Sequence, residues 1–170
     1  MERTAHPERR FFVRFVALLI GFGLVQLLVP ELQQPAQVGF ARLLTGTLRG
    51  LGWSGVARDD VVVSFPGGGF AIGSECTGLA LLALLVAFVF AFPAPTRARL
   101  GGVALGMAVL FVANSARLVS CAYIMRYRPE WFSFTHEYVW QIGLVGLTFA
   151  LIAGWARSTS SVEEVPRARG

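Results

Sequence analysis

Four long apolar runs divide the chain, at about residues 11–29, 77–92, 100–123 and 136–155. A helix rises about 1.5 Å per residue, so about 20 apolar residues span the hydrocarbon core of a bilayer. The second run is short for this purpose. Hydrophobic residues make up 55% of the chain and charged residues 15%, which excludes an ordinary soluble domain. We predict an all-α integral membrane protein with about four transmembrane helices in a single membrane domain, residues 1–170.

The basic residues indicate how the chain lies in the membrane. Arginine supplies all 15 of them, mostly near the ends of the apolar runs. The leader, the short loop 93–99 and the tail are rich in arginine, although the loops 30–75 and 126–135 also carry it. Short cytoplasmic loops carry an excess of basic residues. We therefore predict a multi-pass protein of the cell (inner) membrane with both termini cytoplasmic, and with an external loop over residues 30–76. The basic balance fits a lipid bilayer surface as partner and not nucleic acid.

The first apolar run and the polar tail differ in their predicted structure. The first apolar run follows Arg9 and Arg10, as in a signal peptide, but no small-x-small cleavage site comes after it. Pro30 ends the run instead, so we expect a retained transmembrane helix. The polar tail, residues 158–170, is predicted to be disordered.

The external loop is predicted to contain an amphipathic helix over residues 36–53. The apolar face of that helix is formed by Phe40, Leu44, Leu48 and Leu51. Its opposite face carries Arg42, Thr45 and Arg49. This pattern is typical of a helix on the outer leaflet of a membrane. Packing of the same face against the transmembrane helices would give the same pattern, and both interpretations stay open.

A short β-hairpin is predicted immediately before the second apolar run. Residues 60–65 are rich in valine, Pro66–Gly69 is turn sequence, and Phe70–Ile72 resumes an extended pattern. The hairpin leads directly to Cys76.

Cys76 lies where polar chain changes into an apolar run, in the sequence Ser-Glu-Cys-Thr-Gly-Leu. We predict that it occupies the first turn of the second transmembrane helix, where the partial positive charge of the helix terminus favours a thiolate. Glu75 acts in the opposite direction. Alternatively, a lone cysteine in an apolar context is a small buried hydrophobe. Cys121 forms no CxxC pair with it, which argues against a zinc site or thioredoxin-like couple.

Polar residues inside the third apolar run form the second candidate group. Asn114, Arg117 and Cys121 recur at i, i+3 and i+7, so they share one helix face. An arginine inside the membrane costs at least ~2.5 kcal/mol and usually faces the protein interior or a wet cavity. The alternative is an outward-directed Arg117, with Asn114 bonded to a neighbouring helix. The Gly102-x-x-x-Gly106 spacing is a helix-packing signal.

His136 opens the fourth run. Histidine exchanges protons readily near neutral pH, although at a helix start it is often only a cap or a surface group. In the predicted topology Cys76, Arg117 and His136 converge on the outer half of the membrane. Together they would supply a nucleophile, a fixed cation and a proton carrier.

Three motifs in this order resemble the exosortase/archaeosortase family of membrane cysteine transpeptidases: Cys76-Thr77-Gly78 at a helix start, Asn114-x-x-Arg117 in a later helix, and His136 opening the next. The resemblance covers about residues 61–155. Thr77 stands where serine is common, and larger members have additional N-terminal spans.

The resemblance implies an enzyme that cleaves the C-terminal sorting signal of an exported protein, outside the membrane. Such a signal consists of a short motif, a transmembrane helix and a basic tail. Cys76 would be the nucleophile that forms a thioester, Arg117 the thiolate and oxyanion stabiliser, and His136 the general acid/base. Asn114, Thr77 and Gly78 would support them.

Two other functions remain open at this point. One is a four-helix membrane thiol redox protein that uses Cys76 with Cys121. The other is a non-enzymatic membrane scaffold or transporter subunit, in which Arg117 and Asn114 mediate helix contacts. The sequence indicates neither a metal nor an organic cofactor, and it does not define the oligomeric state.

Overall fold

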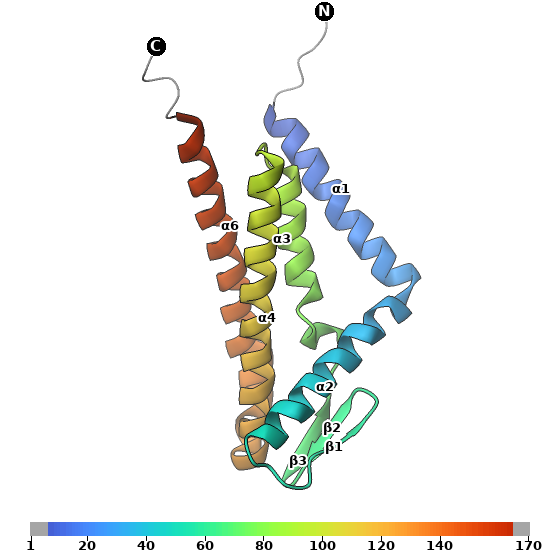
Figure 1. Ribbon diagram of the computed structural model, residues 1–170. Helices are drawn as coiled ribbons and strands as arrows, with labels where there is room; N and C mark the ends of the chain where they lie inside the picture. The colour runs from blue at the N-terminus through green and yellow to red at the C-terminus, as the bar shows by residue number, and fades with distance from the viewer. Residues whose placement is uncertain (1–6, 165–170) are drawn as a thin grey trace, which may run out of the picture.

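The computed structural model describes residues 7–164, which are mostly helical (Figure 1). The α-helices are α1 (Pro7–Leu28), α2 (Gln34–Gly50), α3 (Leu79–Ala91), α4 (Thr96–Tyr127), α5 (Phe132–Phe134) and α6 (Trp140–Glu164). Short helical turns of other types are η1 (Pro30–Gln33), η2 (Ser74–Cys76), η3 (Pro129–Trp131) and η4 (Thr135–Val139). The strands β1 (Ala57–Asp59), β2 (Val62–Phe65) and β3 (Gly68–Ala71) form one antiparallel sheet in the order β1-β2-β3.

Three helical segments of the described chain are long and apolar enough to cross a membrane: Glu8–Leu28, Thr96–Tyr127 and Pro129–Thr159. They confirm the predicted helical membrane protein. The second apolar run forms α3, which has only 13 residues. Its short length agrees with the short run, and the number of membrane crossings stays a prediction.

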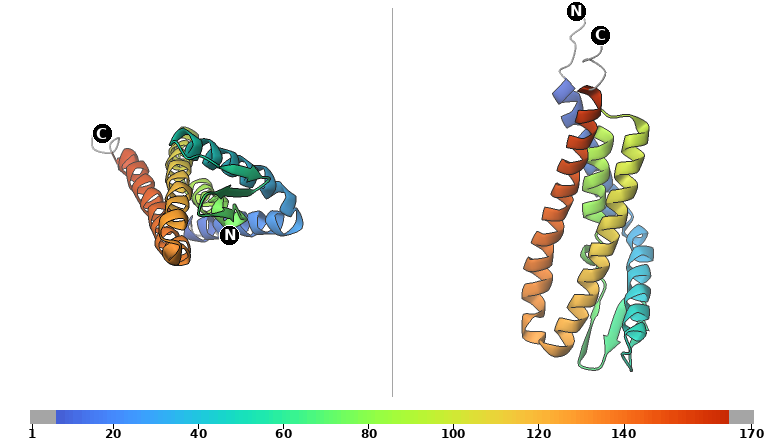
Figure 2. Two further views of the ribbon diagram at one scale, coloured as in Figure 1. Left: turned by 90° about the horizontal axis from the view of Figure 1, so that it is seen from below. Right: turned by 60° about the vertical axis from the view of Figure 1, so that its left-hand side comes forward.

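The helix ends sort into two opposite ends of the molecule. The beginning of α1, the end of α6 and the α3–α4 connection lie together, while α2 and the sheet lie at the other end (Figures 1 and 2). At the α3–α4 connection, Arg99 Nη2 donates to the carbonyl oxygen of Phe92 at 3.0 Å, and Trp155 Nε1 donates to that of Ala98 at 3.0 Å. The first bond closes the connection on itself, and the second holds it against α6.

The structure corrects the predicted start of the second helix. Gly78 has a left-handed backbone, with φ of 71°, and α3 begins only at Leu79. Cys76 therefore lies in the separate turn η2 and not in the first turn of the helix. The left-handed residue breaks the backbone hydrogen-bond pattern, so the apolar run begins before the helix does.

The predicted hairpin is present, but it belongs to a larger sheet. The turn is shorter than predicted, because Gly68 and Gly69 already belong to β3 and the turn is confined to Pro66–Gly67. Val63 of β2 therefore pairs with Phe70 of β3. A third strand, β1, pairs with β2 and was not predicted. All three β1 residues are exposed, so the strand lacks the alternation of apolar and polar residues that marks a half-buried strand.

The helix predicted over residues 36–53 is present as α2, which ends at Gly50, and protein covers part of its apolar face. Thr45, expected on the polar face, is buried, whereas Leu51, expected on the apolar face, is exposed beyond the end of the helix. Leu44 and Leu48 are buried together with Val63 of the sheet and Leu118 of α4. Packing, one of the two interpretations left open, therefore accounts for these two leucines. The position of α2 on an outer leaflet stays a prediction.

The core has two parts, and both involve α4. One lies among α2, the sheet and the second half of α4, and includes Cys76. The other lies among α3, the first half of α4 and α6. The predicted Gly102 and Gly106 packing signal is confirmed there, because a Cβ at Gly102 would collide with the Trp155 ring and one at Gly106 with Leu85.

The structure also corrects part of the predicted disordered tail. The helix α6 continues to Glu164, and the hydroxyls of Ser158 and Thr159 both donate to the carbonyl oxygen of Trp155 at 2.8 Å. No glycine or proline interrupts the sequence there until Pro166. Residues 165–170 lie outside the described part of the chain.

Candidate active site

The turn η2 presents Cys76 between the sheet and α3. The Cys76 backbone N–H donates to the carbonyl oxygen of Gly73 at 3.0 Å. The Thr77 hydroxyl donates to the carbonyl oxygen of Ser74 at 2.6 Å and accepts the N–H of Leu79 at 3.4 Å. Thr77 therefore ties η2 to the first residue of α3, which is the contribution of this predicted supporting residue.

The predicted polar face of α4 points at this turn. Asn114 Nδ2 donates to the carbonyl oxygen of Cys76 at 2.8 Å, and Arg117 Nη1 donates to that of Glu75 at 3.2 Å. Asn114 and Arg117 are each 2% exposed, so the alternative of an outward-directed Arg117 is wrong. Two side chains one helical turn apart thus hold two successive carbonyls of η2.

His136 completes the cluster from η4. Its Nε2 lies 3.3 Å from Cys76 Sγ and 3.2 Å from Arg117 Nη2. The ring stacks on Phe132, with centroids 5.5 Å apart and planes 15° apart. The structure therefore brings Cys76, Arg117 and His136 together.

The contact between Arg117 and His136 fixes a tautomer. A guanidinium only donates hydrogen bonds, so Nε2 must be the unprotonated nitrogen of a neutral ring. That nitrogen has one lone pair, for which the Cys76 thiol is a second donor at similar distance. Nε2 is consequently placed to accept a proton from the thiol.

Arg117 is a buried cation without a carboxylate partner among the described residues. The ion pair found there joins Arg128 and Glu130, elsewhere in the chain. Arg117 Nε also has no hydrogen-bond partner. An unpaired buried charge is expensive, and an anion formed next to it would compensate that cost.

The electrostatics of Cys76 are dominated by burial. Burial raises the pKa of the Cys76 thiol above its ordinary value, and the positive charge of Arg117 opposes this rise without cancelling it. Glu75 raises the pKa further, as expected. The free site therefore favours a neutral thiol, because burial outweighs the nearby charge. The sequence left the thiolate question open, with the helix terminus and Glu75 acting in opposite directions.

Sequence reasoning missed the stacking partner of His136 and the separate turn η2. Phe132 lies four positions before His136, a spacing that would have indicated a stack had η3, α5 and η4 been expected as continuous helical structure. Cys121, the other thiol, is fully buried in α4 and unpaired.

The fold and the cluster define the class of protein: a membrane protein in which a buried cysteine, histidine and arginine meet beside a break between two helical segments. A model of one family, described as transmembrane exosortase (Exosortase_EpsH), matches residues 7–154. The chain belongs to the transmembrane exosortase family. Comparison with curated proteins and with solved structures found no match.

Proposed function

We propose that the protein is a membrane-embedded cysteine protease or transpeptidase that removes the C-terminal sorting signal of exported proteins. The observation that carries the proposal is the 3.3 Å contact between Cys76 Sγ and His136 Nε2 beside the unpaired Arg117. Family membership supports the reaction class. The substrate is an exported protein with a short motif, a transmembrane helix and a basic tail.

We further propose that the site faces the periplasm or exterior, with both termini cytoplasmic. Support comes from the end of the molecule where α1 begins, where α6 ends and where α3 joins α4 (Figure 1). Arg9, Arg97, Arg99 and Arg157 belong to these segments. The cluster around η2 lies toward the opposite end, and α3 would be the shortest of four crossings.

The first chemical step is a proton transfer within the cluster. The Cys76 S–H bond breaks, its proton moves to His136 Nε2, and the electron pair stays on sulfur as a thiolate. Once Nε2 is protonated it no longer accepts the hydrogen bond of Arg117 Nη2. That donor is then free to face the thiolate, and later the oxyanion.

Acylation follows on the substrate. The thiolate attacks the scissile carbonyl carbon, the carbonyl electrons move to oxygen, and Arg117 stabilises the resulting negative charge. The C–N bond then breaks, and imidazolium of His136 gives its proton to the departing amine. Water or an acceptor amine afterwards attacks the thioester, which releases the Cys76 thiol and defines hydrolysis or transpeptidation.

The test is co-expression with an exported protein that carries a motif, a helix and a basic tail at its C-terminus, with its size read on a gel. Wild-type enzyme should remove the C-terminal segment, and Cys76→Ala should not. The matched control is Cys121→Ala, which should process normally. Equal processing by Cys76→Ala would overturn the proposal, whereas loss of processing in Cys121→Ala would favour a two-cysteine redox function.

A further inference from the structure

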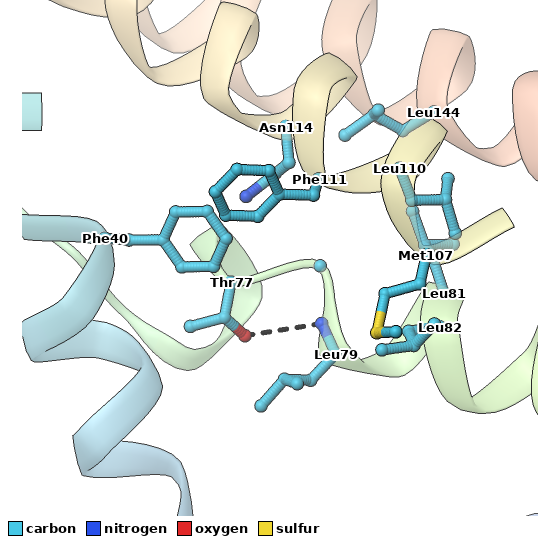
Figure 3. A pocket seen from close by; sticks show the side chains of 11 residues that line it. Phe40, Thr77, Leu79, Leu81, Leu82, Met107, Leu110, Phe111, Asn114 and Leu144 are labelled. Carbon is cyan, nitrogen blue, oxygen red and sulfur yellow. Dashed lines mark hydrogen bonds between the residues drawn. The ribbon is translucent and has the colours of Figure 1, made fainter. Parts of the chain in front are cut away.

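A cavity of about 180 Å³ lies next to the turn that carries Cys76 (Figure 3). Its walls come from α2, α3, α4 and α6, together with the two residues that follow Cys76 in sequence. The lining residues are Phe40, Thr77, Gly78, Leu79, Leu81, Leu82, Met107, Leu110, Phe111, Asn114 and Leu144. An apolar cavity of about 150 Å³ is large enough to admit a benzene ring, so this one can hold an apolar side chain of about that size but not the larger tryptophan side chain.

One lining side chain has an unused polar atom. Asn114 is 2% exposed, and its Oδ1 has no hydrogen-bond partner among the described residues. A Cβ built on Gly78, which also lines the cavity, would lie 3.7 Å from this oxygen. The other end of the same amide is occupied, because Nδ2 donates to the Cys76 carbonyl oxygen. An unpaired buried acceptor of this kind indicates a missing donor.

The cavity lies on the membrane-centre side of the cluster. Along α4 its lining residues Met107, Leu110 and Phe111 precede Asn114, and Arg117 follows one turn later. Residue 111 is close to the midpoint of α4, which runs from 96 to 127. A polypeptide that passes Cys76 and then enters the membrane would reach this cavity directly after the scissile bond.

We propose that this cavity binds an apolar side chain of the substrate on the C-terminal side of the scissile bond, within two residues of it, with a substrate backbone N–H donating to Asn114 Oδ1. The inference rests on the proposed function. It adds a specificity site on the leaving-group side, at the point where the substrate's own transmembrane helix begins.

The unused acceptor argues for a polypeptide and against a lipid chain as the occupant. An acyl chain would fill the apolar walls but offers no donor to Asn114, whereas every peptide unit except that of proline carries an N–H. The shared amide also links occupancy to reactivity. A substrate that donates to Oδ1 is positioned by the same Asn114 side chain that binds the Cys76 carbonyl oxygen.

The experiment enlarges a substrate side chain and then enlarges the cavity to match it. The cleavage site is first mapped by mass spectrometry of the released segment, and tryptophan then replaces each of the two residues that follow the cleaved bond. Wild-type enzyme should cleave one of these substrates at least about tenfold more slowly, by steric exclusion. Leu82→Ala should restore most of the lost rate, and Met107→Ala, at a residue that is 49% exposed, gives a second enlargement with little effect on folding.

Two controls make the result specific to the cavity. Leu100→Ala removes the same side chain from a 58% exposed position near the start of α4 and should restore nothing. Tryptophan placed before the cleaved bond should give a rate that Leu82→Ala leaves unchanged.

Failure of rescue by both enlarged variants, while each cleaves the unmodified substrate, would overturn the inference and leave the proposed function intact. Absence of any cleavage by wild type would overturn both. Rescue only of the substrate with tryptophan before the cleaved bond would place the cavity on the N-terminal side of that bond and would overturn the inference. A lipid retained in native mass spectra, and lost in Leu82→Phe without a change in cleavage, would assign the cavity to lipid and also overturn the inference.

Discussion

The Sγ atom of Cys76 lies 3.3 Å from Nε2 of His136, although the two residues are 60 positions apart in sequence. Neither belongs to a regular α-helix. Cys76 lies in η2, and His136 lies in η4, a wider helical turn of a type frequently found at functional sites. The contact therefore depends on two local departures from α-helical geometry, and Phe132 supports it by stacking on the imidazole.

Replacement of His136 by alanine should lower the cleavage rate by about 10²–10⁴-fold, the usual contribution of a positioned acid/base. The reason is that no other acceptor takes the thiol proton in the described cluster. The rate is measured with the co-expressed substrate. Tyr138→Ala, in the same turn but 57% exposed, is the control and should retain most activity. A His136→Ala enzyme with wild-type rate would contradict the mechanism.

Replacement of Arg117 by lysine should not preserve activity, despite the retained charge. Arg117 makes two directed contacts from different nitrogens, to the Glu75 carbonyl oxygen and to His136. A lysine ammonium lacks this planar arrangement, so we expect a loss of about 10²–10³-fold in cleavage rate. Arg126→Lys, which keeps a cation over the Trp53 ring, is the control. An equal loss of cleavage rate in Arg117→Lys and Arg126→Lys would show that the effect is not specific to Arg117.

Alkylation of Cys76 should report its raised pKa. Only the thiolate reacts, so in a Cys121→Ala background the alkylation rate should rise about tenfold per pH unit from pH 7 to beyond the ordinary range of a cysteine. The sign follows from burial, which raises the pKa of Cys76 more than Arg117 lowers it. Arg117→Gln should raise the pKa further and slow alkylation at pH 8. An alkylation rate that reaches a plateau below pH 8 in the Cys121→Ala protein with Arg117 intact would show that the thiolate is the resting form.

Replacement of Gly78 by alanine should destabilise the protein by about 1–2 kcal/mol, because an L-residue is strained in the left-handed conformation. Its φ is 71°, and its Cβ would meet Asn114 at an ordinary 3.5 Å, so backbone strain dominates. Thermal unfolding in detergent measures the effect. Gly143→Ala, in α6 with nothing within 4 Å of the added carbon, should be neutral or stabilising. Similar shifts of the unfolding temperature in Gly78→Ala and Gly143→Ala would contradict backbone strain at residue 78 as the cause.

Much of the cluster could be predicted from residues alone. An arginine and an asparagine three positions apart inside an apolar run must share a helix face, and their cost in a membrane indicates a buried polar site. Asn114 and Arg117 are buried on that face. Cys76 at the start of an apolar run and His136 at the start of another were also candidates from the residues, and the family resemblance added their catalytic roles. The structure brings both to Arg117.

What could not be predicted depends on three-dimensional context. The separate turn η2 arises from the left-handed backbone at Gly78, which an apolar run does not signal. The strand β1 is held by hydrogen bonds to β2 and has no apolar pattern of its own. The raised pKa of Cys76 follows from burial by distant segments, and the cavity beside it exists only where four helices meet.

The short helix α3 has a consequence for the lipid around the protein. Its 13 residues extend over about 20 Å, whereas the hydrocarbon core of a bilayer measures about 30 Å. In the proposed topology, in which α3 crosses the membrane, this helix therefore leaves about 10 Å of the hydrocarbon core unmatched. A bilayer that thins locally relieves this mismatch and brings water nearer to Cys76. The proposed topology and function therefore predict that cleavage depends on membrane thickness. Reconstitution into lipids of increasing acyl length should progressively slow cleavage.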